Sequence, residues 1–144
     1  HVTGVQTCAL PIYYSTRTGR ENTAIAGYSL GGRESLFLCF AHPDVFGYVG
    51  AFAPVGGVVD TGSGERVYGN KGFLLSELVK DGGQQPLVTL IVTGDSDPYC
   101  KQSAINYSDD KRRKGINHIF YIRPGAHEVS VWNNGLYNFI RRIF

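Results

Sequence analysis

The sequence lacks the features that mark membrane proteins, disulfide-rich proteins and zinc-binding modules. No apolar stretch among its 144 residues approaches the roughly 20 residues that a membrane-spanning helix needs. Its three cysteines, Cys8, Cys39 and Cys100, form no CxxC motif and have no histidine at zinc-ligand spacing. Internal repeats and low-complexity tracts are also missing. A disulfide framework, a structural metal site and a repeat architecture are therefore not indicated.

A large excess of charge of one sign is missing too. The formal net charge is +2, and the densest basic run is Lys111-Arg112-Arg113-Lys114. Such a run can contact phosphate or a membrane surface, but a solvated helix end is the favoured interpretation. We therefore expect neither a nucleic acid nor a membrane as partner.

Glycine and ordinary apolar residues are abundant. With 42% apolar and 18% charged residues, the chain has the composition of one soluble globular domain at most. The 19 glycines cluster at 27–32, 56–72 and 82–83, which indicates tight turns and functional loops.

The first twelve residues need separate treatment. Val2 to Ile12 resembles, residue by residue, the translation of a widely used sequencing-adapter oligonucleotide. We therefore interpret residues 1–12 as an artefact of sequencing and exclude them from the fold. On this interpretation the natural sequence starts near Tyr13, partway through a gene, and a signal peptide would lie upstream of it.

Apolar runs of two kinds alternate along the rest of the chain. Short, largely β-branched or apolar runs predict strands at 23–26, 48–52, 87–92 and 118–122, with the first buried in the sheet. Helical spacing predicts helices from Leu30 to a stop at Pro43 and over 73–80, 101–114 and 131–144. The glycine-rich stretch Pro54–Gly72 is expected to be an irregular, functional loop. Together these elements predict an α/β fold with a parallel sheet and flanking helices.

Gly27-Tyr28-Ser29-Leu30-Gly31 matches the G-x-S-x-G motif between a predicted strand and a predicted helix. In a nucleophile elbow this turn is strained, lifts the serine hydroxyl clear of the sheet, and aims the next backbone N–H at an oxyanion. Side chains two positions to either side are expected to collide with neighbouring elements. The motif therefore predicts Ser29 as nucleophile and the Leu30 N–H as oxyanion donor; a simple Gly/Ser turn is the alternative.

A serine nucleophile needs a base, and His127 is the preferred candidate. It follows the last predicted strand, and loops at the carboxyl ends of parallel strands bind ligands in α/β sheets. His1 lies in the suspected artefact, His42 is expected to cap a helix or face solvent, and His118 is expected to pack or face solvent.

Two aspartates follow the strand before His127, and either can orient an imidazole. Asp97 is the preferred acid, and Asp95 is expected to cap the turn; either could instead cap the following helix. The order Ser29, Asp97, His127 is the order that α/β-hydrolases use.

These motifs resemble the Putative esterase family of α/β-hydrolases, from about Thr23 to the C-terminus. The family includes feruloyl and acetyl xylan esterases of carbohydrate esterase family one, enterochelin esterases and S-formylglutathione hydrolase. Feruloyl esterase domains attached to bacterial xylanases are the most similar. The resemblance rests on four segments: 24–32, 42–47, 94–97 and 125–132.

The resemblance implies a serine carboxylic-ester hydrolase with a Ser29, Asp97 and His127 triad and no metal or organic cofactor. It implies residues 13–144 as the C-terminal part of a single α/β-hydrolase domain, without the N-terminal strands and the second oxyanion donor. The expected substrate is a feruloyl or acetyl ester on a plant polysaccharide such as xylan. Tyr28, Trp132 and the Pro54–Gly72 loop are candidates to line an aromatic acyl pocket, although aromatic residues more often belong to the core.

Several alternatives stay open at this point. The substrate could be a siderophore ester or a small thioester, or the chain could be a non-catalytic carbohydrate-binding relative. The resemblance favours an extracellular bacterial protein, with a cytoplasmic one as the alternative. Nothing in the sequence fixes the oligomeric state.

Overall fold

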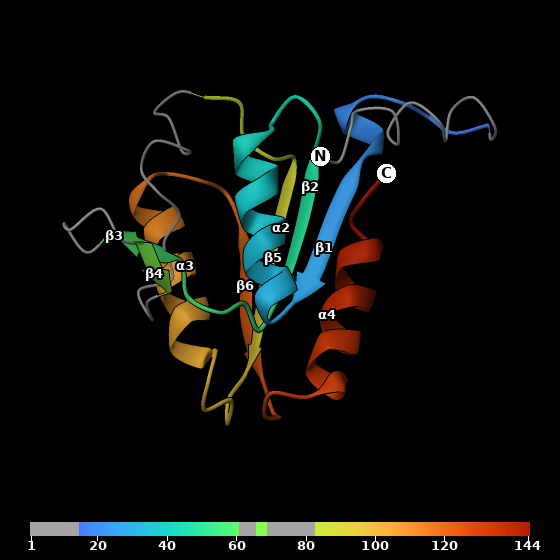
Figure 1. Ribbon diagram of the computed structural model, residues 1–144. Helices are drawn as coiled ribbons and strands as arrows, with labels where there is room; N and C mark the ends of the chain where they lie inside the picture. Colours follow the sequence, from blue (N-terminus) through green and yellow to red (C-terminus); the bar gives the residue numbers. More distant parts are fainter. Residues whose placement is uncertain (1–14, 61–65, 69–82) are drawn as a thin grey trace.

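A four-stranded parallel sheet carries the part of the chain that the computed structural model describes, residues 15–60, 66–68 and 83–144 (Figure 1). The strands lie in the order β1 (Ala24–Tyr28), β2 (Tyr48–Phe52), β5 (Val88–Gly94) and β6 (Ile119–Arg123). Every neighbouring pair is parallel, so all four strands end at the same edge of the sheet. The suspected artefact at 1–12 and the helix expected over 73–80 lie outside the described residues.

Helices cover both faces of the sheet (Figure 1). The helices α2 (Leu30–Ala41) and α3 (Lys101–Arg113) pack on one face, and α4 (Val129–Ile140) packs on the other. Within the described ranges no helix has the length and apolarity needed to cross a bilayer. This arrangement is that of a partial α/β-hydrolase fold.

Alternation along the strands divides the core into two clusters, as the pleat of a two-sided sheet requires. Val49, Ala51 and Ile91 point to the α2 and α3 face, where Leu36 and Tyr107 complete the packing. The residues that form the opposite cluster with α4 are Tyr48, Phe52, Leu90, Val92, Val131 and Phe139.

The prediction of a buried strand at 23–26 was wrong about its burial. β1 is parallel, as expected, but it pairs only with β2 among the described strands, and residues 23–26 are half-buried or exposed. A short apolar run cannot distinguish an edge strand from a central one, because it does not report how many neighbours the strand has.

The glycine-rich stretch after Pro54 is not wholly irregular. It contains two short strands, β3 (Val58–Asp60) and β4 (Arg66–Tyr68), which pair antiparallel as a separate two-stranded sheet. A short 3-10 helix, η1 (Arg20–Asn22), precedes β1.

The basic run at the end of α3 departs from the expected solvated helix end. Arg112 and Arg113 are exposed, but Lys111 is fully buried, with its ammonium 4.4 Å from the centre of the Phe40 ring. Lys111 to Arg113 are the last three residues of α3 and Lys114 is its C-cap, so the side chains of the run point in directions about 100° apart and one of them faces the sheet.

Candidate active site

Ser29 occupies a strained turn between β1 and α2. Its backbone angles are φ 53° and ψ −119°, a conformation that non-glycine residues rarely adopt. The Ser29 N–H donates to the Phe52 carbonyl at 2.8 Å, and the Ser29 carbonyl accepts from the Val55 N–H at 3.2 Å. These bonds hold the strained residue at the carboxyl end of the sheet, with the Leu30 N–H at the first position of α2.

The two glycines of the motif are not equivalent. A Cβ at Gly27 would lie 2.4 Å from the Gly31 carbonyl oxygen, so this position must be small. A Cβ at Gly31 would meet nothing within 4 Å, which contradicts the expectation that both positions are crowded. Gly31 is exposed on the first turn of α2, whereas a Cβ at the buried Gly32 would lie 3.2 Å from the Gly27 carbonyl oxygen and from the Pro54 Cα.

The structure brings Ser29, His127 and Asp97 into one series of hydrogen bonds. His127 Nε2 lies 3.0 Å from Ser29 Oγ, and His127 Nδ1 lies 2.8 Å from Asp97 Oδ2. An ionised carboxylate can only accept, so Nδ1 carries the proton and donates to Asp97. The lone pair of Nε2 is then directed at the Ser29 hydroxyl, which donates to it.

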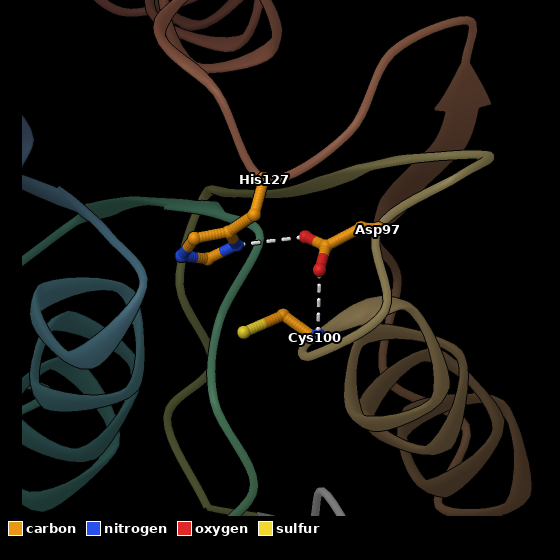
Figure 2. Close-up of side chains that lie close together, drawn as sticks. All are labelled: Asp97, Cys100 and His127. Atoms are coloured by element: carbon orange, nitrogen blue, oxygen red, sulfur yellow. Dashed lines mark hydrogen bonds and ion pairs between the residues drawn. The ribbon is translucent and has the colours of Figure 1, made fainter.

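Asp97 is buried and well supplied with donors. Its Oδ1 accepts from the Tyr99 N–H at 2.9 Å and the Cys100 N–H at 2.8 Å, just before α3 begins. Figure 2 shows the carboxylate between the Cys100 backbone and the His127 ring. The carboxylate therefore both binds the imidazole and accepts backbone N–H groups at the start of a helix.

Asp95 fixes the loop that carries His127. Its carboxylate accepts from the Gly125 N–H at 3.1 Å and from the Ser96 hydroxyl at 2.9 Å. These hydrogen bonds, that of Ser96 first, lower the pKa of the exposed Asp95. A Cβ at Gly94 would lie 2.2 Å from the Gly125 carbonyl oxygen, so the two loops approach as closely as backbones can.

Aromatic rings surround the His127 imidazole. Tyr99 and Trp132 contact it edge-on, with ring centres 5.8 Å and 5.3 Å away. Trp132 in turn stacks on Tyr28, with centres 4.1 Å apart and planes 15° from parallel. The sequence predicted Tyr28 and Trp132 beside the substrate, and the structure places them beside each other and next to His127.

A cleft of about 320 Å³ opens beside this aromatic pair. Its largely apolar lining consists of Ala26, Gly27, Tyr28, Phe52, Val129, Trp132, Asn133 and Leu136. The indole N–H of Trp132 is buried without a hydrogen-bond partner among the described residues.

The other described histidines lie away from Ser29. His42 is the C-terminal cap of α2, where its N–H donates to the Leu38 carbonyl. His118 bonds to Ser108 Oγ at 2.8 Å and to the Ile116 carbonyl at 2.9 Å. Both placements agree with the structural roles that the sequence suggested.

Sequence reasoning missed Cys100. Cys100 is 1% exposed, and its sulfur lies within 4.8 Å of an Asp97 carboxylate oxygen and a His127 ring nitrogen. Burial, followed by the charge of Asp97, raises the pKa of the Cys100 thiol to about 11. The spacing Asp97-x-x-Cys100 at a helix start was the available signal, because it directs the Cys100 N–H onto the carboxylate.

Solved structures of esterases share this arrangement of elements. A CE1 ferulic acid esterase from the anaerobic fungus Anaeromyces mucronatus is 33% identical and superposes with a TM-score of 0.82 over 99% of this chain. The same fungal enzyme in complex with ferulic acid gives a TM-score of 0.83. An S-formylglutathione hydrolase from Staphylococcus aureus, 19% identical over 94% of this chain and 56% of its own, superposes at 0.73 and so shares the fold.

The chain spans about half of the fungal enzyme, 51% of its length. Residues 10–143 match the Putative esterase family, which is nearly the whole sequence. The chain therefore belongs to the Putative esterase family.

Proposed function

We propose that residues 13–144 are the C-terminal part of a single α/β-hydrolase domain that hydrolyses carboxylic esters. Ser29 is the nucleophile, His127 the general base and Asp97 the residue that orients the base. The observation that carries this proposal is the unbroken series of hydrogen bonds from Ser29 Oγ through His127 to Asp97 Oδ2. A serine hydroxyl is a weak nucleophile alone, and this series supplies the base that it needs.

Acylation follows from the geometry. His127 Nε2 takes the Ser29 proton as Oγ attacks the ester carbonyl, and the Leu30 N–H stabilises the oxyanion. Asp97 stabilises the imidazolium that forms. His127 then gives the proton to the departing alcohol oxygen, which leaves an acyl group on Ser29.

Deacylation reuses the same groups. Water occupies the place of the alcohol, His127 Nε2 removes its proton, and the hydroxide attacks the acyl carbonyl. The second tetrahedral intermediate collapses when His127 returns the proton to Ser29 Oγ. The free acid leaves, and the hydrogen bonds among the three side chains form again.

The proposed substrate is a feruloyl or acetyl ester on a plant polysaccharide. The cleft beside Tyr28 and Trp132 is apolar and has a volume within the range of small-molecule sites, and its lining residue Trp132 contacts the His127 ring. The similarity to an enzyme solved with ferulic acid supports an aromatic acyl group. A polysaccharide substrate favours action outside the cell.

A fluorophosphonate probe tests the nucleophile directly. The probe should label the purified chain at Ser29, and Ser29→Ala should abolish labelling and remove the triad-dependent hydrolysis of p-nitrophenyl acetate. Ser96→Ala, which alters an exposed serine beside Asp95, is the matched control and should keep both. Equal labelling of Ser29→Ala and the parent chain would contradict the assignment.

The acyl group is tested by comparing substrates. Methyl ferulate, acetylated xylan and p-nitrophenyl acetate should be assayed with the parent chain and with Trp132→Ala. We expect Trp132→Ala to lose ferulate hydrolysis more than acetate hydrolysis, because only the larger acyl group reaches the aromatic pair. An equal loss on all three substrates would place the aromatic acyl group elsewhere.

A further inference from the structure

Three side chains that bind metal ions well, those of Asp97, Cys100 and His127, lie close together. Asp97 comes from the turn after β5, Cys100 from the residue before α3, and His127 from the loop after β6 (Figure 2). One ligand atom from each lies within 4.8 Å of the others. In the part of the chain that the structure describes, these residues form a mixed sulfur, nitrogen and oxygen donor set.

The donor set has the chemistry of a zinc site. Zinc binds cysteine sulfur, histidine nitrogen and carboxylate oxygen at about 2.0–2.3 Å, and open sites use three protein ligands and a water. Ligand atoms around such an ion are about 4 Å apart or less, so the three side chains need only small rotations to close on it.

The positions of the three residues also favour capture of an ion. The Cys100 N–H donates to Asp97 Oδ1 at 2.8 Å, so the Cys100 backbone and the carboxylate are fixed relative to each other, and burial restricts the Cys100 side chain. Both side chains are buried, whereas the His127 side chain is 19% exposed and provides the route from solvent. An ion that enters past His127 therefore meets two pre-positioned ligands.

We propose that a thiophilic divalent cation of the zinc class binds Asp97, Cys100 and His127 and reversibly inhibits the enzyme. Bonds form from the metal to sulfur, to one ring nitrogen and to one carboxylate oxygen, and they displace metal-bound waters. The S–H bond breaks and its proton goes to solvent. The ring stays neutral, because a proton on the ligating nitrogen moves to the other nitrogen, and no electron is transferred.

Inhibition follows because the ion binds His127 and Asp97, the two residues on which the activation of Ser29 depends. His127 bound to a metal can no longer accept the Ser29 proton while Asp97 orients it. This consequence rests on the proposed function, whereas the binding itself does not.

Cadmium tests the binding, because a cadmium–thiolate bond has a charge-transfer absorption in the ultraviolet. Cd²⁺ titrated into the purified chain should produce this band with one equivalent bound, and Cys100→Ser should abolish it. Cys8→Ser and Cys39→Ala are the matched controls and should keep it. A band that persists in Cys100→Ser, or that disappears in Cys8→Ser, would overturn the site.

The role of His127 is tested by calorimetric Zn²⁺ titration of His127→Asn, which leaves every cysteine in place. Zinc affinity should fall at least about tenfold, the loss seen even when a metal ligand's supporting partner is removed. Unchanged affinity would mean that a lone thiol binds the ion, and the three-residue site would be wrong.

Fluorophosphonate labelling separates the two proposals. Zn²⁺ should block labelling of the parent chain, a chelator should restore it, and Cys100→Ser should be labelled with or without Zn²⁺. If the probe labels nothing under any condition, the proposed function fails, while the cadmium and zinc titrations still decide the site. Labelling that Zn²⁺ leaves unchanged in the parent chain would overturn the inhibition.

Discussion

Asp97 and Lys111 are both buried, yet their surroundings differ completely. Asp97 accepts hydrogen bonds from His127, from the Tyr99 N–H and from the Cys100 N–H. The Lys111 ammonium has no hydrogen-bond partner among the described residues and lies over the rings of Phe40 and Tyr107. Burial lowers the pKa of Lys111 to about 8, although the neighbouring Asp110 opposes the shift.

The difference shows that burial of a charge has no single meaning. A buried charge such as that of Asp97 is stabilised by hydrogen-bond donors that already point at it, so it can bind the imidazole without rearrangement of the site. A charge over aromatic rings gains some cation–π attraction, but the energetic cost of its desolvation remains. We therefore expect the first group to govern activity and the second to govern stability.

The largest effect is expected at Asp97. Asp97→Asn keeps the size of the side chain but removes the charge that holds the His127 Nδ1 proton. The turnover number on p-nitrophenyl acetate should fall by about four powers of ten, because the imidazole adopts the wrong tautomer. Circular dichroism should confirm an unchanged fold, and turnover within about tenfold of the parent would refute the role of Asp97.

A stability gain is expected at Lys111. Lys111→Met fills the same space without a charge and should raise the free energy of unfolding by about 1–3 kcal/mol. Urea denaturation measures this change, with Arg112→Met on the exposed side of α3 as the control. A loss of stability in Lys111→Met would mean that the ammonium has a partner that compensates its burial.

The stability contribution of Lys111 should depend on pH. The pKa of Lys111 is about 8 in the folded chain, whereas a lysine in the unfolded chain has the ordinary value of 10.5, so the unfolded chain binds the proton more readily between these values. The penalty is complete below about pH 8 and disappears as the pH rises toward 10.5. The stability difference between the parent and Lys111→Met should shrink over this window.

The smallest effect is expected at Asp95. Asp95→Asn keeps an oxygen that can accept from the Gly125 N–H, so the His127 loop should stay in place. Its loss of turnover should be a small part of the loss in Asp97→Asn when both are measured in the same assay. The opposite ranking would exchange the two assignments.

Sequence reasoning located Ser29, Asp97 and His127 because each follows a predicted strand, and parallel strands end at one edge. It could not find Cys100, whose position near His127 depends on how the start of α3 packs against the loop after β6. The burial of Lys111 was detectable, since it continues the buried stripe of Ala104 and Tyr107 at helical spacing. The edge position of β1 could not be detected from the sequence, because the order of the strands is set only when the sheet assembles.

That edge position has a consequence for local opening of the chain. The hydrogen bond from the Ser29 N–H to the Phe52 carbonyl joins the end of β1 to β2, and β1 has no second neighbour among the described strands. Strands paired on one side open more readily than those paired on both. Amide hydrogen exchange should therefore be faster in β1 than in β2, and weakening of the sheet should disturb the geometry at Ser29.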